Sequence, residues 1–595
     1  MATPTVGEFV LQRLREHGIT RIFGYPGDGS TGLDLALEHV EGIDFVQTRH
    51  EELAALAACA HAKLTGEVGC CLATSGPGAI HLLNGLYDAK LDHVPVLALV
   101  GQQDRMSMGG DFQQEVDLLT LFKDVASDFV QQCTVPEAAA HLVDRAVRTA
   151  QARRSVTALV FPGDVQDEPH RDPPRAHGAV VSSSRPASGS VFRADDAAIA
   201  EAAEVLNAGE RVAILVGQGA KGALDEVLEV AELLGAGIAK ALNGRAVVPD
   251  DLPQVTGPVG LLGSSASDAL MEGCDTLLLV GTAFPYAEWL PEPGQARSVQ
   301  VDRDAKLIGM RHATEVNLVG DAAQTLRALV PHLRRKADRG WRSAVEREVA
   351  RWWAQLEARA HVPADPVNPQ LAFHELSARL PDEAIVLTDS GSATAWWARH
   401  LRLRRGMDAA LSGTLATMGC AVPYALAAKL AHPDRPVVAT LGDGAMQMIG
   451  INGLIDLAAY ADRFGEGGLV VLVLNNGDLN FVTWEQRVMG GAPRVAQTQD
   501  LPPFDYAQFA RNVGLEGIRV ERPEDVGAAW DRALAAGRPA VIDLVCDPEV
   551  PPMPPEIRSE FAKGLLGAVR GGDPGTGRFV RQAVREKVAD WRAGR

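Results

Sequence analysis

Residues 441–476 have the types and spacing that most clearly suggest chemistry. They comprise an apolar run, a turn at Gly442–Gly444 (GDG), a helical pattern and a second apolar run that ends at Asn475 and Asn476. A glycine turn at the carboxyl end of a parallel strand, opening a helix, offers backbone N–H groups to a phosphate. Aspartate and amide oxygens nearby can bind Mg²⁺, which also holds phosphate oxygens. The pattern therefore predicts a site for a diphosphate and a magnesium ion.

This spacing of GDG and NN resembles the diphosphate–magnesium motif of thiamine diphosphate (ThDP) enzymes. ThDP chemistry also needs a carboxylate beside the cofactor's pyrimidine ring. There it shares a proton with a ring nitrogen and favours the tautomer that deprotonates the thiazolium carbon. The run TRHEELAALAA (48–58) resembles the segment that supplies this carboxylate, and the resemblance assigns the role to Glu51. Taken alone, Glu51 would more often be a solvated acid at a helix start.

The resemblance extends over roughly residues 5–557 and is to the pyruvate oxidase and acetohydroxyacid synthase group. It is strongest to the quinone-dependent pyruvate oxidases. Segments that carry it include RIFGYPGDGS (21–30), TSGPGAIHLLNGLYDA (74–89), LLLVGTAFPY (277–286) and TMGCAVPYALAAKL (417–430). The family has a pyrimidine-binding domain, a central domain that binds FAD in some members, and a diphosphate-binding domain.

The resemblance implies roles for particular residues of this chain. The magnesium ligands would be Asp443, Asn476 and, through its backbone carbonyl, Asp478. The expected contacts to ThDP are Gly27, Ser390, Gly391, Ser392, Ala416, Met418, Gly442, Gly444 and Ala445. Ala416 falls where the family often has glycine. Met418 matches the apolar residue that props the cofactor into its bent conformation, and core packing is the alternative interpretation.

The middle of the chain has residues at positions that resemble FAD contacts of the family. They are Gly217, Gly219, Thr282, Asp302 and Asp321. A G-x-G after a strand is weak evidence alone, but the run GTAFPY (281–286) strengthens it. We therefore expect bound FAD rather than a vestigial site.

The expected substrate side distinguishes an oxidase from a synthase. Nine residues beyond the NN pair lies Glu485, where the resemblance places Glu in pyruvate oxidases and Trp in acetohydroxyacid synthases. Val482 would line the substrate pocket. The family's Phe-Gln-Glu occurs as FQQE (112–115), with one extra residue, so Gln114 is the expected polar contact and the pocket would be more polar. His81 either faces the cofactor cleft or is an ordinary packed or exposed histidine.

Short apolar runs alternate with longer amphipathic stretches along most of the chain. VPVLALVG (94–101), RVAILVG (211–217) and GLVVLVLNN (468–476) are apolar nearly throughout, which is typical of strands covered on both faces in a parallel sheet. Helical patterns lie between them. The alternation predicts an α/β protein, with three doubly wound parallel-sheet domains.

Two linkers divide the chain into these domains. One is HGAVVSSSRPASGS (177–190), and the other runs from about 335 to 368 with an amphipathic helix inside it. We expect a ThDP pyrimidine-binding domain at 1–176, a central FAD-type domain at 191–335, a diphosphate- and magnesium-binding domain at 369–556 and a C-terminal tail at 557–595.

Composition excludes several classes of function. Lys plus Arg is 57 and Asp plus Glu is 76, a net charge of −19, so the chain is a poor general nucleic-acid binder. No apolar run reaches the roughly 18 residues of a membrane helix, and the N-terminal residues are not typical of a secretory signal. The seven cysteines lie mostly in apolar runs, which favours reduced, buried thiols in a cytoplasmic protein.

The tail differs from the rest of the chain. Residues 571–578 (GGDPGTGR) are typical of a flexible hinge, and residues 579–595 of an amphipathic helix with a net charge of +3. Its apolar stripe would be Val580, Val584, Val588 and Trp591. The resemblance implies a peripheral contact with the inner face of the cell membrane, where a quinone would lie. The alternative, which we favour, is a helix that packs on the enzyme's own body or caps the active site.

We therefore expect a ThDP-dependent enzyme that decarboxylates a small 2-oxo acid, with pyruvate the first choice, and oxidises the product through FAD. The alternatives are an acetolactate synthase-like carboligase, a non-oxidative decarboxylase and a catalytically silent regulatory subunit. Intact Glu51, Asp443 and Asn476 argue against the last. The resemblance also implies a homodimer or homotetramer, because each cofactor lies between the pyrimidine domain of one subunit and the diphosphate domain of another.

Overall fold

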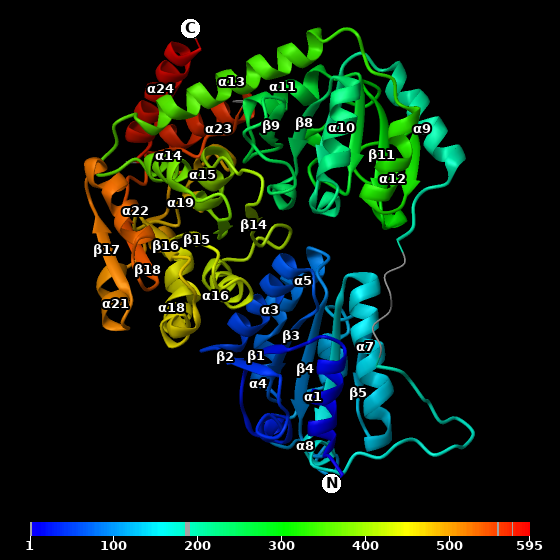
Figure 1. The fold of residues 1–595 in the computed structure, drawn as a ribbon. Helices are drawn as coiled ribbons and strands as arrows, with labels where there is room; N and C mark the ends of the chain where they lie inside the picture. Colours follow the sequence, from blue (N-terminus) through cyan, green and yellow to red (C-terminus); the bar gives the residue numbers. More distant parts are fainter. Residues whose placement is uncertain (1–2, 185–190, 556–558, 574, 595) are drawn as a thin grey trace.

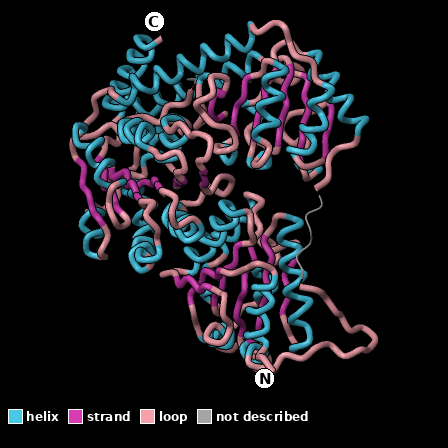
Figure 2. The backbone as a smooth tube through the Cα atoms, in the orientation of Figure 1, coloured by secondary structure: helices cyan, strands magenta, loops and turns pink. Residues whose placement is uncertain are grey.

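The computed structural model describes residues 3–184, 191–555, 559–573 and 575–594. It has three six-stranded sheets, and neighbouring strands within each sheet are parallel. Helices cover both faces of the sheets (Figures 1 and 2). The predicted α/β class with three doubly wound domains is confirmed. All seven cysteines are free and buried, as expected.

The first sheet has the strand order β2-β1-β3-β4-β6-β5. Its strands are β1 (Arg21–Tyr25), β2 (Asp44–Gln47), β3 (Gly69–Ala73), β4 (Val96–Gln102), β5 (Phe129–Gln132) and β6 (Val156–Pro162). The helices of this domain are α1 (Val6–Glu16), α2 (Thr31–Ala36), α3 (Glu51–Thr65), α4 (Pro77–His81), α5 (Leu83–Leu91), α6 (Leu118–Phe122), α7 (Ala139–Arg153) and α8 (Gly163–Gln166). Strands β4 and β6 are buried along their whole length, because helices cover both faces.

The central sheet has the strand order β12-β11-β10-β7-β8-β9. Read from β9, this is the 3-2-1-4-5-6 order of dinucleotide-binding sheets. Its strands are β7 (Val212–Val216), β8 (Gly237–Lys240), β9 (Val255–Pro258), β10 (Thr276–Val280), β11 (Arg297–Asp302) and β12 (Val316–Val319). Its helices are α9 (Asp196–Ala208), α10 (Leu224–Leu234), α11 (Ser265–Gly273) and α12 (Ala322–Leu329).

The third sheet repeats the topology of the first, with the order β14-β13-β15-β16-β18-β17. Its strands are β13 (Ile385–Thr388), β14 (Asp408–Ala410), β15 (Val437–Gly442), β16 (Leu469–Asn475), β17 (Glu516–Val520) and β18 (Ala540–Val545). Its helices are α14 (Pro369–Arg379), α15 (Ser392–His400), α16 (Ala421–Ala431), α17 (Asp443–Ala445), α18 (Ile451–Ala459), α19 (Asn480–Val488), α20 (Ala496–Gln499), α21 (Tyr506–Asn512) and α22 (Val526–Leu534).

The two expected linkers differ in structure. The described part of 177–190 is a loop, and residues 185–190 lie outside the described residues. The second contains α13 (Gly340–Ala360), which buries Val345, Val349, Trp352 and Leu356 in the core of the central domain. This helix is therefore a packed element rather than a connection, because its apolar stripe is long enough to cover part of the central sheet.

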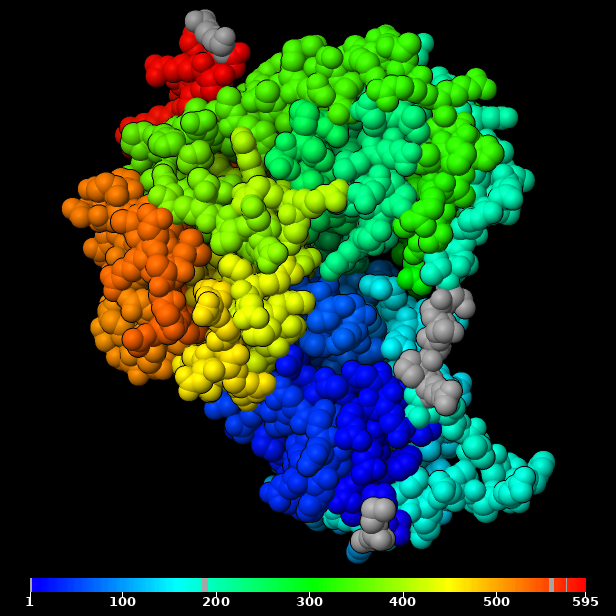
Figure 3. Space-filling model, in the orientation of Figure 1, coloured from blue at the N-terminus to red at the C-terminus, as the bar shows by residue number. Residues whose placement is uncertain are grey.

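The three domains meet in a buried polar cluster beneath the alanine-rich helices α3 and α16. The Nζ atom of Lys63 lies 2.7 Å from Asp92 Oδ2 and 2.7 Å from the hydroxyl of Tyr424. From the central domain, Asn243 donates to Asp92 Oδ1 at 2.9 Å. Figure 3 shows the N-terminal domain, in blue, seated against the parts of the chain coloured yellow and green.

The tail forms two helices, α23 (Ser559–Arg570) and α24 (Thr576–Ala593), and α24 lies beside α13 (Figure 1). The expected flexible hinge between them is wrong at Asp573, which is buried and paired with Arg487 at 2.7 Å. Among the described residues, no helix is long and apolar enough to cross a membrane.

Helix α24 packs on the protein's own body, but with its polar side inward. Gln582, Glu586 and Asp590 are buried, whereas Val584 and Trp591 are 56% and 58% exposed. Arg359 of α13 donates to both carboxylate oxygens of Asp590, at 2.6 and 2.8 Å. The Arg359–Asp590 ion pair determines the orientation of the helix. Leaving a buried guanidinium without a carboxylate partner would cost more free energy than leaving the thin apolar stripe exposed to solvent.

Candidate active site

The strand orders determine where ligands can bind. In a doubly wound sheet, a crevice opens at the carboxyl ends of the two strands where the order reverses. These strands are β1 and β3 in the first domain, β7 and β10 in the central domain, and β13 and β15 in the third. The glycine-containing turns singled out in the sequence follow these same strands, which places them at the three crevices.

A single cleft of about 1990 Å³ joins the crevices of the central and third domains. Eighteen of the predicted site residues line it: Gly217, Gly219, Thr282, Asp302, Asp321, Ser390, Gly391, Ser392, Ala416, Met418, Gly442, Asp443, Gly444, Ala445, Asn476, Asp478, Val482 and Glu485. Of the described residues that line it, none is Gly27, Glu51 or Gln114. The expected site residues therefore fall into two groups.

Asp443 is the most strongly constrained residue of the cleft. Its side chain accepts hydrogen bonds from the backbone N–H groups of Gly444 at 2.9 Å, Asn476 at 2.8 Å and Gly477 at 2.6 Å. Burial raises the pKa of Asp443 to about 6, although these three donors act in the opposite direction. In the described part of the chain the carboxylate has only uncharged donors. A divalent cation in the cleft would supply the missing positive charge.

The other two expected metal ligands lie beside Asp443. The side-chain oxygen of Asn476 accepts from the backbone of Asp478 at 3.0 Å. The Oδ1 atom of Asp478 accepts from Thr483 at 2.9 Å and from Arg494 at 2.8 Å. The resemblance assigns the backbone carbonyl of Asp478 to the metal; that oxygen accepts one bond, from Asn480, and retains a second lone pair.

The backbone around the expected diphosphate site has room for a ligand. A Cβ atom added to Gly391 or Gly442 would have no neighbour within 4 Å, whereas one at Gly444 would lie 2.7 Å from Leu479. Ala416 has a φ of +54°, in the left-handed region where glycine is strongly favoured. This conformation suits the glycine that the resemblance leads us to expect at this position.

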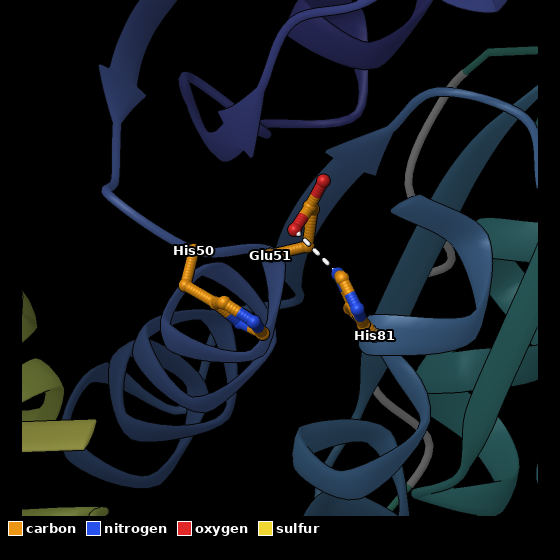
Figure 4. A group of neighbouring side chains, drawn as sticks. All are labelled: His50, Glu51 and His81. Atoms are coloured by element: carbon orange, nitrogen blue, oxygen red, sulfur yellow. Dashed lines mark hydrogen bonds and ion pairs between the residues drawn. The ribbon is translucent and has the colours of Figure 1, made fainter. Parts of the chain in front are cut away.

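The first domain holds the second group of residues, around the carboxyl ends of β1 and β3. Glu51 begins α3 and is bonded through Oε2 to Nδ1 of His81, the last residue of α4, at 2.9 Å (Figure 4). His50, the N-cap of α3, accepts from the backbone N–H of Glu52 through Nδ1 at 3.1 Å. Ligand atoms of His50, Glu51 and His81 all lie within 4.8 Å of one another.

Gln114 and Gly27 lie in the same region of the first domain. Gln114 accepts from the hydroxyl of Ser75 at 3.3 Å, and its own φ is +62°. A Cβ atom at Gly27 would lie 2.6 Å from Thr74, so this turn needs glycine for packing. Both residues contact the turn after β3, which brings them toward Glu51 and His81.

Comparison with known proteins decides the family. Residues 4–121 match the thiamine pyrophosphate enzyme N-terminal TPP binding domain, residues 199–329 its central domain and residues 389–544 its C-terminal TPP binding domain.

The chain belongs to the thiamine pyrophosphate enzyme family.

Relatives cover nearly the whole length of this thiamine pyrophosphate enzyme. It is 36% identical over 566 residues to the putative thiamine pyrophosphate-containing protein YdaP of Bacillus subtilis, covering 95% of each chain. It is 29% identical over 565 residues to the pyruvate oxidase of Lactiplantibacillus plantarum (93% and 91%). It is 31% identical over 564 residues to the acetolactate synthase of Arthrospira platensis (90% and 93%).

The central domain of this enzyme gives mixed evidence about its ligand. A Cβ atom at Gly217 or Gly219 would meet the backbone of Gly281 at 2.4 or 2.8 Å, so close packing alone requires both glycines. Asp321 caps α12 by accepting from Gln324 at 3.1 Å. Asp302 ends β11, and burial raises its pKa. The evidence for a ligand in the central domain is therefore the cleft that these residues line, and not the contacts of any single side chain.

Helix α19 carries the expected substrate residues on the side that faces the cleft. Val482 is 48% exposed there, and Glu485 is half-buried, which raises its pKa. On the opposite side, Trp484 is buried among Val488, Met553 and Phe579. Trp484 therefore packs against the tail, in agreement with the register that assigns Glu485, not Trp484, to the substrate side.

Sequence reasoning missed Asp389, which directly follows β13 in the motif TDSGS. It accepts from the backbone N–H groups of Ser390, Gly419 and Ala421 at 2.8–2.9 Å. Burial raises the pKa of Asp389 to about 6. The carboxylate ties the Ser390 turn to the loop that carries Met418. In the sequence, only its position directly before the turn at residues 390–392 indicated that Asp389 belongs to the site.

Proposed function

We propose that this enzyme uses ThDP, Mg²⁺ and FAD to decarboxylate a small 2-oxo acid, pyruvate in the first instance, and to oxidise the resulting fragment. Bound ThDP would supply the nucleophilic carbon and accept the electron pair released with CO₂. Asp443, Asn476 and the carbonyl of Asp478 would hold the metal. Val482 and Glu485 would line the substrate end of the cleft, where a half-buried carboxylic acid with a raised pKa can exchange a proton with the substrate.

The observation that carries this proposal is the continuity of the cleft. It runs from the Asp443 turn, past Glu485, to Thr282 and Asp302 of the central domain without interruption. A redox cofactor in the central crevice would therefore have direct access to the reacting end of ThDP. The pyruvate oxidase among the relatives supports the same assignment.

A spectroscopic experiment tests the redox part of the proposal. The purified protein should be yellow, with a flavin spectrum that bleaches when pyruvate is added under argon and returns when air is admitted. A colourless protein, or a flavin spectrum that persists while pyruvate is consumed, would contradict FAD-mediated oxidation.

The second candidate is an acetolactate synthase-like carboligase, which is favoured by the acetolactate synthases among the relatives. Such an enzyme transfers the two-carbon fragment to the carbonyl of a second substrate. Product analysis separates the candidates: acetate indicates oxidation, acetolactate indicates carboligation, and acetaldehyde indicates simple decarboxylation.

We expect the active enzyme to be at least a homodimer, and a homotetramer is the preferred state. The motivation is that Glu51, Gln114 and Gly27 do not line the cleft of their own chain, among the residues that the structure describes. A symmetric pair would complete two sites, each from the first domain of one copy and the third domain of the other. Light scattering and activity measured on the same fractions should agree; a fully active monomer would contradict this arrangement.

We also propose that the tail contacts the membrane surface peripherally. This would bring the enzyme close to a quinone in the membrane, which would accept the electrons from FAD. The outward side of α24 presents Val584, Val588 and Trp591, with Arg581, Arg585 and Arg592 on the same helix. An apolar and cationic face is attracted to anionic lipid. We expect the full-length protein to float with anionic liposomes at low salt and the protein lacking 571–595 to stay in solution.

A matched variant sharpens this test. Trp591→Ser with Val588→Ser removes two exposed apolar side chains of α24 and leaves the Arg359–Asp590 pair in place, so it should lose lipid binding without losing activity. If the full-length protein stays off the lipid with and without substrate, membrane contact through this tail is wrong.

A further inference from the structure

The carboxylate of Glu51 has an immediate polar neighbour, His81, which the family comparison does not assign to any role. The two residues come from the start of α3 and the end of α4, and the Nδ1 atom of His81 lies 2.9 Å from Glu51 Oε2 (Figure 4). The side chain of Glu51 is 12% exposed and that of His81 is 44% exposed. His81 therefore stands between a nearly buried carboxylate and the surrounding solvent.

The hydrogen bonds settle which ring nitrogens carry protons. A carboxylate only accepts, so His81 donates from Nδ1 to Glu51, and in its neutral form Nε2 remains an acceptor. His50 accepts the backbone N–H of Glu52 at its Nδ1, so its proton lies on Nε2. The two imidazole rings are in contact, with centroids 4.5 Å apart and their planes tilted by 30°. His50 thus supports the ring of His81 without competing for Glu51.

This arrangement favours proton chemistry over metal binding at the three side chains. A metal would require a free lone pair on each ligand. The Nδ1 lone pair of His50 is engaged by the helix N-terminus, and the nearest nitrogen of His81 carries the proton shared with Glu51. Binding a cation would break both contacts.

The second oxygen of Glu51 is left available. Oε1 faces Gly78 of α4, where an added Cβ atom would lie 3.2 Å from it. Glycine at this position keeps space open beside Oε1. With Oε2 held by His81, the carboxylate presents one defined oxygen to an incoming ring nitrogen.

We propose that His81 is a positioning residue for Glu51: its Nδ1–H group holds Oε2 and so directs Oε1 toward the cofactor's pyrimidine ring. This inference rests on the proposed role of Glu51 in activating ThDP. Because the donor and the carboxylate come from two different helices, the hydrogen bond between them limits the rotation of the carboxylate.

Among the described residues, the ionisable side chains in contact with His81 are those of Glu51, which begins α3, and of His50, its N-cap. The next carboxylate, that of Glu52, is bonded to Asn84 instead. The variant His50→Asn retains an N-cap side chain and removes the other imidazole, so it separates the contribution of His50 from that of His81.

The test measures hydrogen–deuterium exchange at the thiazolium carbon of bound ThDP in the holoenzyme at pH 7, by rapid acid quench and NMR. His81→Leu should slow exchange by about 10- to 100-fold, the rate equivalent of a lost hydrogen bond to a charged group. His81→Asn retains a donor, so it should exchange within about threefold of the wild type. His50→Asn should exchange at close to the wild-type rate.

Exchange slowed by more than about tenfold in His81→Asn would overturn the proposal, whether or not His81→Leu folds, because a retained donor would then fail to support Glu51. So would normal exchange in a folded His81→Leu protein. Glu51→Gln distinguishes a failure of the proposed role of Glu51 from a failure of the proposed role of His81. If Glu51→Gln exchanges normally, the proposed role of Glu51 fails. If it is slow while both His81 variants behave as wild type, only the role of His81 fails.

Discussion

Glu51→Gln is expected to lower turnover at least about 1000-fold, within the range that proton transfer by a positioned side chain contributes. ThDP affinity should change only a few-fold. The amide fills the same volume and can still bond to His81, but it cannot share an acidic proton with the pyrimidine ring nitrogen as a carboxyl group does. Steady-state kinetics with saturating ThDP, together with calorimetric titration of ThDP, would measure the two quantities separately.

Glu52→Gln is the matched control, because Glu52 is the next residue of α3 and bonds only to Asn84 among side chains in the described structure. Its amide retains an oxygen for that contact, so activity should stay near the wild-type value. Near-normal turnover in Glu51→Gln would mean that another residue activates the cofactor.

Asp443→Ala is expected to weaken Mg²⁺ and ThDP together, by at least about 100-fold for ThDP, or roughly 2.7 kcal/mol. One ion bridges protein and diphosphate in this arrangement, so neither ligand should retain normal affinity without the other. Isothermal calorimetry of ThDP at fixed Mg²⁺, repeated in excess EDTA, would show whether the variant has lost the metal-dependent part of binding. An unchanged ThDP affinity would refute the site.

A control for general damage is Asp456→Asn. Asp456 is another buried aspartate of the third domain, it is bonded to Arg49 rather than exposed to the cleft, and burial raises its pKa to about 7. This variant should bind ThDP normally.

The pKa of Asp443, raised to about 6 by burial, also predicts a pH dependence. A carboxyl group with a raised pKa stabilises the cofactor-free fold least when it is ionised, so its contribution is lost as the pH rises from about 4 through 6. Magnesium binding requires the ionised form. The gain in melting temperature on adding Mg²⁺ and ThDP should therefore grow between pH 5 and 7 and then level off.

Much of the architecture could be predicted from the sequence because the signals are local. Runs such as VPVLALVG (94–101) are apolar on both faces, and only strands inside a parallel sheet can bury them fully. The GDG turn and the NN pair end neighbouring strands, so their meeting at one sheet edge follows from parallel pairing. Ser390 and Gly217 were expected only from the resemblance, and they follow β13 and β7, the switch-point strands whose carboxyl ends border the crevices.

The tertiary structure alone decided how these pieces combine. Periodicity identified a helix over 579–595 but could not show which side faces the protein: Arg359 and Gln370, more than 200 positions away, bind its acidic side. Trp484 and Glu485 are neighbours in sequence, yet one is buried under the tail and the other lines the cleft. The pairing of Glu51 with His81 likewise depends on two helices that leave different strands. Such contacts join residues far apart along the chain, and no local pattern encodes the distances between them.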